Sequence, residues 1–91
     1  MCTNIIENVQ VTGSGKGSSG WFELRQANIS FDHPFNAQLE HALNIDFVNS
    51  ELGLETRVAV ELSRESAYRL IQAIETALGR GEIELGIEQT V

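Results

Sequence analysis

The sequence contains little cysteine and little proline. Its one cysteine, Cys2, has no partner for a disulfide within the chain, which favours a reducing, cytoplasmic setting. One proline in 91 residues and a hydrophobic content of 42% are typical of a globular protein rather than a disordered one. A chain of this length should form a single domain, 1–91, with a modest core, and domains this small often gain stability as homo-oligomers.

Positive charge is also scarce, because six Lys and Arg stand against thirteen Asp and Glu, for a net charge of −7. The basic residues are dispersed, whereas nucleic-acid phosphates and anionic membranes bind to clustered positive charge. We therefore expect no nucleic-acid partner and no membrane partner. The first ten residues have neither the basic start nor the apolar run of a signal peptide, and no apolar stretch is long enough to span a membrane.

A first hairpin is expected from two strand-like runs, 5–11 and 21–31, which are rich in β-branched and aromatic residues. Between them, the glycine-rich segment 12–20 is typical of a loop. The apolar residues change face midway along both runs. One hairpin would then serve two apolar layers, so we expect its tip to pack elsewhere, for example on another subunit.

The pairing within this hairpin decides where the chain start lies. If the turn is centred near Lys16, paired residue numbers sum to about 33. Val9 then lies opposite Leu24, and Cys2 lies opposite Phe31. The chain start is therefore expected at the end of the second strand.

The remaining segments predict a second hairpin and a helix. Residues 43–47 alternate between apolar and polar, and 56–62 follow after a short turn. Residues 63–78 predict a helix that begins after Ser63 as N-cap and stops before a glycine at position 79. Its apolar stripe should cover the sheet. The stripe consists of Ala67, Leu70, Ile71, Ile74, Ala77 and Leu78.

Residues 82–88 again alternate, which predicts a fifth, edge strand or an arm that reaches a neighbouring subunit. The fold class is therefore α+β: an antiparallel sheet of four or five strands, with one helix packed on one face and strand order ββββα along the chain.

The link between the second and third predicted strands, 32–42, is about twice as long as an ordinary hairpin loop, and long ordered loops are often functional. This link carries both histidines of the chain, His33 and His41. Because the predicted hairpin brings Cys2 to the same end of the sheet, the only thiol and the only imidazoles are expected close together.

One thiolate and two imidazoles suit zinc or another transition metal such as copper. Asp32 or Glu40 would fill a fourth position or orient an imidazole. The alternative is structural: His33 bonds a loop carbonyl, His41 begins a strand, and Cys2 is a terminal thiol. The spacing of these residues matches no established metal motif, so both interpretations stay open.

The segment GKGSSG, 15–20, has the glycine spacing of a dinucleotide-binding loop. A strand is expected after it, rather than the helix whose N-terminus would hold a pyrophosphate, so dinucleotide binding is not expected. Gly15, Lys16 and Gly17 offer at most a weak anion-binding nest. A hairpin tip is the simpler interpretation.

Several short strings occur together in this chain: MCTN (1–4), GSGKG (13–17), GWF (20–22), FDHPF (31–35), EHALNIDFVN (40–49) and RVAVEL (57–62). This combination resembles a small bacterial family of unknown function, over most of the chain up to the helix. The resemblance implies a bacterial, cytoplasmic setting and does not indicate any particular activity. In that family the loop often reads D-H-P-x-H-A, and Asn36 stands here at the position of the third histidine. A metal site in this chain would then be weaker or altered.

Three functions follow as hypotheses. The first is a small binding or accessory protein with a metal or ligand site at the N-terminus and the 32–41 loop. The second is a structural homo-oligomeric subunit, or an accessory subunit of a larger enzyme, with Trp21 and Phe22 as core or interface anchors. The third, an enzyme, uses Cys2 as an N-terminal nucleophile after removal of Met1. No other catalytic arrangement is evident.

Overall fold

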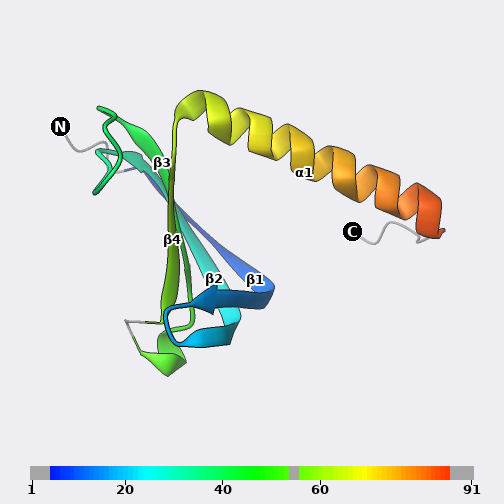
Figure 1. Cartoon of the computed structure of the whole chain (residues 1–91), viewed down its shortest axis with the longest axis horizontal. Helices are drawn as coiled ribbons and strands as arrows, with labels where there is room; N and C mark the ends of the chain where they lie inside the picture. The colour runs from blue at the N-terminus through cyan, green and yellow to red at the C-terminus, as the bar shows by residue number, and fades with distance from the viewer. Residues whose placement is uncertain (1–4, 54–55, 87–91) are drawn as a thin grey trace.

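A computed structural model describes residues 5–53 and 56–86 of the chain. The elements are β1 (Ile6–Gly17), β2 (Gly20–Asp32), β3 (Ala42–Val48), the short 3-10 helix η1 (Ser50–Leu52), β4 (Arg57–Leu62) and α1 (Arg64–Leu85). The four strands form one antiparallel sheet in the order β1-β2-β3-β4, and α1 follows the last strand (Figure 1). The predicted α+β fold with strand order ββββα is therefore confirmed.

The sheet has one apolar face and one polar face, because side chains alternate along each strand. Ile29 pairs with Ile45, and Ile45 pairs with Val60, so these three residues share a face. The apolar face consists of Ala27, Ile29, Phe31, Leu43, Ile45, Phe47, Val58, Val60 and Leu62. The polar face consists of Asn28, Ser30, Asn44, Asp46, Ala59 and Glu61. Strands β3 and β4 match the period-2 pattern that predicted them.

The first hairpin differs from the prediction in its turn and its register. The glycine-rich segment is not a loop: β1 runs to Gly17, and the turn is closed by Gly20, whose φ of +112° favours glycine. Val9 pairs with Ala27 instead of Leu24, an offset of three residues, and the register shifts again between Gln10 and Gly13. The Phe31 amide donates to the Ile5 carbonyl, and Cys2, its predicted partner, lies outside the described residues.

Glycines in β1 let the hairpin tip fold over the apolar face of the sheet. A Cβ at Gly15 would lie 3.0 Å from Leu24 Cδ2 and 3.4 Å from Val58 Cγ2, and one at Gly17 would lie 3.2 Å from the Phe22 ring. Because these glycines carry no side chain, the tip approaches β4 closely. The tip thus packs on its own sheet, and its expected contact with another subunit stays a prediction. The glycine run marks close packing rather than a mobile loop.

The helix begins as predicted but is longer than predicted. The Ser63 hydroxyl accepts a hydrogen bond from the Ser66 amide at 3.1 Å, as an N-cap does. The helix continues through Gly79 and ends at Gly86, whose left-handed φ of +65° is typical of a helix C-cap. The fifth strand expected over 82–88 is therefore wrong up to position 86, and positions 87 and 88 lie outside the described residues.

Only the start of α1 packs against the sheet. Ala67 is buried, and the helix contacts β3 and β4 before it extends beyond the sheet at an open angle (Figure 1). The stripe residues Leu70, Ile71, Ile74 and Leu78 remain 44–60% exposed. Within the described ranges, the buried apolar residues are Pro34 and three alanines, at positions 27, 42 and 67. The expected covering of the sheet is thus limited to the first turns of the helix.

Candidate functional site

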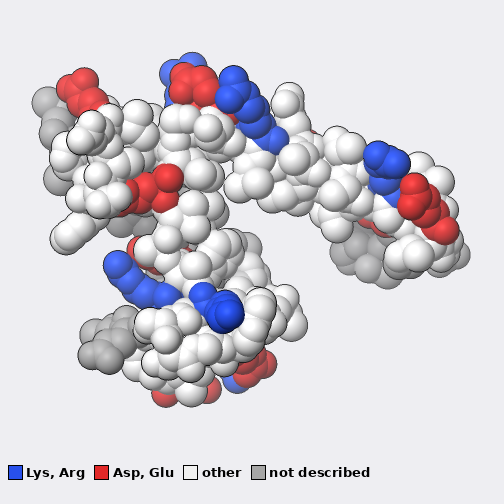
Figure 2. Space-filling view, viewed as in Figure 1, with Lys and Arg blue, Asp and Glu red and all other residues white. Residues whose placement is uncertain are grey.

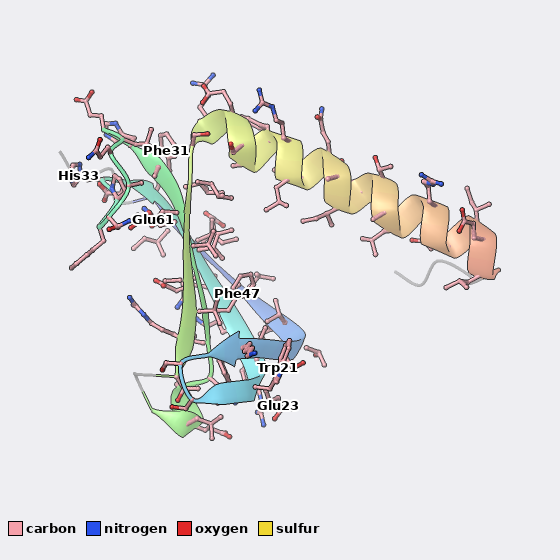
Figure 3. All side chains as sticks on the ribbon, in the orientation of Figure 1. Trp21, Glu23, Phe31, His33, Phe47 and Glu61 are labelled. Carbon is pink, nitrogen blue, oxygen red and sulfur yellow. The ribbon has the colours of Figure 1, made fainter. Side chains whose placement is uncertain are left out.

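The 33–41 loop lies at the end of the sheet where β2 ends, β3 begins and β4 ends. Pairing of Leu43 with Leu62 brings the last residues of β4 beside this loop. Glu61, on the polar face, accepts hydrogen bonds from three consecutive loop amides (Figure 3). The shortest distances are 2.6 Å from the Phe35 amide, 3.1 Å from the Asn36 amide and 2.7 Å from the Ala37 amide. One carboxylate thus fastens the loop to the edge strand.

These bonds also change the acidity of Glu61. Hydrogen bonds from the amides of Ala37, Phe35 and Asn36 favour the carboxylate and lower the pKa of Glu61 below its ordinary value, against a smaller opposing effect of desolvation. Glu61 is therefore ionised at neutral pH and serves as an acceptor. A general acid would need the opposite shift, so the site gives no support to a catalytic dyad of Glu61 and Asp46.

The same three bonds hold Phe35 at the surface. Its backbone amide is bound by Glu61, while its side chain is fully exposed. A large apolar side chain on an anchored loop offers contact area at low entropic cost, which is typical of residues that anchor binding interfaces. Phe35 was not among the residues that the sequence singled out.

His33 lies on the side of the loop toward the polar face. Its amide donates to Asp32 Oδ1 at 2.7 Å, and its ring Nδ1 lies 3.2 Å from the Glu40 carbonyl oxygen. A carbonyl only accepts, so this bond places the proton on Nδ1 and leaves the lone pair on Nε2. His33 lines a shallow groove of about 230 Å³ together with Asp46 and Glu61.

His41 lies toward the other face. Its ring stacks on Phe31 with a centroid distance of 5.8 Å and an interplanar angle of 19°. Phe31 belongs to the apolar face and lines a different groove from that of His33. The two imidazoles are therefore directed to opposite sides of the sheet.

This placement bears on the predicted metal ligands. Over residues 5–53 and 56–86, the structure contains no group of three His, Cys, Asp or Glu arranged to hold a metal ion. Within the set Asp32, His33, Glu40 and His41, the observed contacts are those of loop structure: a backbone amide, a backbone carbonyl and a ring stack. Cys2 lies outside the described residues, so the site that includes it stays a prediction.

Glu61 is the residue of this region that sequence reasoning missed. Its alternation with Val60 and Leu62 indicated only that it faces away from the core. The signal that identifies it is positional: once 43–47 pairs with 56–62, position 61 must lie beside the long loop. A carboxylate there meets loop amides that have no partner of their own in a strand ladder.

A second candidate site is apolar and lies between α1 and the sheet. A groove of about 340 Å³ is lined by Phe31, Leu43, Arg64, Ala67, Tyr68 and Ile71. It continues into the exposed stripe of the helix. In Figure 2 the charged side chains of α1 gather on its upper side, whereas the surface turned toward the sheet is largely uncharged. The groove and the stripe together form one apolar surface, which we call the helix–sheet surface.

The hairpin tip contains the other residues singled out from the sequence. Gly15, Lys16 and Gly17 are strand residues, and extended backbone points successive amides in opposite directions, so the geometry that an anion nest needs is missing. Phe22 is half-buried against the tip glycines, whereas Trp21 is 70% exposed (Figure 3). The two expected anchors thus lie on opposite sides of β2, and Trp21 is the one available for contact.

Comparison with known proteins gives a family but no activity. A family model described as a family of unknown function (DUF6295) matches residues 1–86. No curated protein and no solved structure matches the chain. Among the described residues, no helix is both long enough and apolar enough to cross a membrane.

Proposed function

The chain belongs to the family of unknown function DUF6295, and we propose from its structure that it is a self-assembling structural or accessory subunit. Its working form is a homo-oligomer, in which a second copy covers the helix–sheet surface. The observation that carries this proposal is the exposed apolar stripe of α1.

The size of the molecular surface supports self-assembly. A compact protein of this mass has an accessible surface of about 5,200 Å², whereas this chain, with all 91 residues counted, exposes 7546 Å². The radius of gyration is 15.1 Å, against about 12 Å for a compact chain of this length.

The small core supports the same proposal. No large side chain is fully buried within the described ranges, and the buried apolar residues there are three alanines and Pro34. A 22-residue helix that contains Gly79 and Gly81 also needs tertiary packing, since isolated helices are marginal in water. Its C-terminal half lacks such packing in the single chain.

Sedimentation equilibrium tests the proposal. We expect a dimer or a larger closed oligomer at micromolar concentration, and a monomer for Leu78→Glu, which places a charge in the stripe. Ile83→Glu is the matched control, because Ile83 lies on the other side of the helix and is 82% exposed. A wild-type chain that stays monomeric with intact helix content would refute self-assembly.

A metal or ligand site at Cys2, His33 and His41 is a second proposal, with zinc or another transition metal as its ion, and it requires the His41 ring to leave its stack on Phe31. The observation in its favour is the bond from His33 Nδ1 to the Glu40 carbonyl, because metal-bound histidines usually donate their other ring nitrogen in this way. If this site exists, we expect stoichiometric metal in protein purified without chelators and loss of that metal in His41→Ala. Metal-free wild-type protein would refute it.

Two further proposals concern partners and chemistry. A larger enzyme partner would contact Phe35, so its co-purification should be lost in Phe35→Ala and retained in Ile83→Ala.

An enzyme with Cys2 as nucleophile requires removal of Met1, which intact mass measures directly. A cytoplasmic setting is also proposed and is favoured by the single cysteine, and a bacterial setting rests on the family resemblance alone.

A further inference from the structure

We propose that two copies of the chain pair their α1 helices antiparallel, with Ile74 at the two-fold axis, so that each helix fills the helix–sheet surface of the other. This inference rests on the proposed self-assembly and adds its geometry. It starts from the open angle between α1 and the sheet (Figure 1), where the residues on both sides are apolar.

The space between α1 and the sheet has a shape that fits a helix. One wall is the stripe of α1 and the other is the apolar face of the sheet near Phe31 and Leu43. An antiparallel partner helix that lies along the stripe brings its C-terminal half to the N-terminal half of the first helix. The N-terminal half of the first helix borders the groove at Ala67 and Ile71. The partner's C-terminal turns thus enter the groove, and the two-fold axis repeats the arrangement on the other copy.

The glycine at position 81 supports a close helix–helix contact. Gly81 lies seven residues after Ile74, hence on the stripe, and a Cβ there would meet no atom of the described residues within 4 Å. A glycine inside a helix costs about 1 kcal/mol relative to alanine, and within the described part of the chain no close contact requires a glycine at this position. In the antiparallel pair Gly81 lies at the level of Ala67, seven residues before Ile74, where the lack of a side chain at position 81 leaves room beside the groove.

Charge complementarity selects a second copy as the source of that helix. The N-terminal half, 64–74, has a net charge of +1, and the C-terminal half, 75–85, has a net charge of −2. Antiparallel pairing places opposite charges and opposite helix dipole ends side by side. On one flank of the stripe, Arg64 lies ten residues before Ile74 and Glu82 lies eight residues after it, so each Arg64 comes near the partner's Glu82. The sequence of α1 is thus complementary to itself in this orientation.

Cysteine cross-linking of the full-length chain tests the arrangement. In a Cys2→Ser background, Ile74→Cys places one thiol per chain at the two-fold axis, where oxidation should join two copies. Ile83→Cys is the matched control, since the same substitution lies half a turn away and is more exposed. We expect the disulfide-linked fraction of the dimer to be about tenfold higher for Ile74→Cys, because disulfides form only between closely spaced Cα atoms.

A second pair of variants covers the case in which a cysteine at position 74 weakens the assembly. Gly81→Leu should dissociate the dimer in sedimentation, whereas Gly79→Leu, on the other side of the helix, should leave it intact. A dimer that cross-links no better at position 74 and tolerates Gly81→Leu overturns this arrangement but leaves self-assembly standing. A monomer whose helix closes onto its own sheet, or a complex with an unrelated chain only, overturns both.

Discussion

The carboxylate of Glu61 lies 2.7 Å from the amide nitrogen of Ala37, across 24 residues of sequence. Together with the bonds from Phe35 and Asn36, this contact closes the 33–41 loop onto the edge strand β4. A side chain of a different element therefore helps to set the conformation of the loop, beside the loop's own contacts at His33 and His41. That side chain also covers the end of β4 with a tethered loop, which is one way in which proteins protect an edge strand.

Replacement of Glu61 by glutamine should release the loop without unfolding the sheet. Glutamine keeps the shape but presents one neutral acceptor oxygen, so the three amide bonds cannot all be retained. Amide hydrogen exchange at Phe35 and Ala37 should become about tenfold faster, while exchange in β3 stays unchanged. Glu75→Gln, on the helix, is the control. Unchanged protection of the loop amides in Glu61→Gln would contradict the role of this carboxylate.

Acid should open the same loop. The folded-state pKa of Glu61 is lower than the ordinary glutamate value of 4.5, so its bonds contribute stability that is fully present above that value. This contribution is lost as the pH falls through the lowered pKa. Amide chemical shifts of Phe35 and Ala37 should therefore titrate below pH 4.5. In Glu61→Gln that transition should vanish, and a transition that persists would assign it to another group.

The glycines of β1 offer a matched test of the folded-over hairpin tip. Gly15→Val places methyl groups against Leu24 and Val58, and overpacking of this kind costs about 1–3 kcal/mol. Gly13→Val meets open space and adds a good strand residue, so its free energy of unfolding should change by less than about 1 kcal/mol. Urea denaturation at equal protein concentration measures both. Equal effects of the two valines would contradict close packing at position 15.

The sequence predicted those elements that a short pattern determines. Alternation over 43–47 and 56–62 identified β3 and β4, and the Ser63 cap identified the start of α1. Two predictions that rested on glycines were wrong. In β1 they permit close packing instead of a loop, and in α1 the glycine at 79 does not stop the helix, because the cap that ends it stands at Gly86.

The candidate sites were less predictable than the elements, because they depend on which face each residue occupies. The long loop was identified by its length, but the stack of His41 on Phe31 turns one imidazole away from the other. The predicted hairpin register differs from the observed one by three residues, so the residue expected opposite Cys2 was chosen from the wrong register. Glu61 became evident only when β4 was placed beside the loop. The apolar stripe of α1 was identified correctly from its spacing, but its expected covering of the sheet is wrong beyond the first turns, because spacing alone does not show which surface the stripe meets.

Charge reversal at Arg64 and Glu82 separates dimer contacts from helix stability. Arg64→Glu adds a negative charge at the helix start and Glu82→Arg adds a positive charge near its end, so each change should favour the isolated helix. In the antiparallel dimer each single change instead sets like charges against each other twice. We expect each to weaken dimerisation about tenfold, and the double variant to restore it. Sedimentation gives the dissociation constants, and Arg69→Glu, on the outer side of the helix, is the control. Additive weakening in the double variant would contradict the pairing.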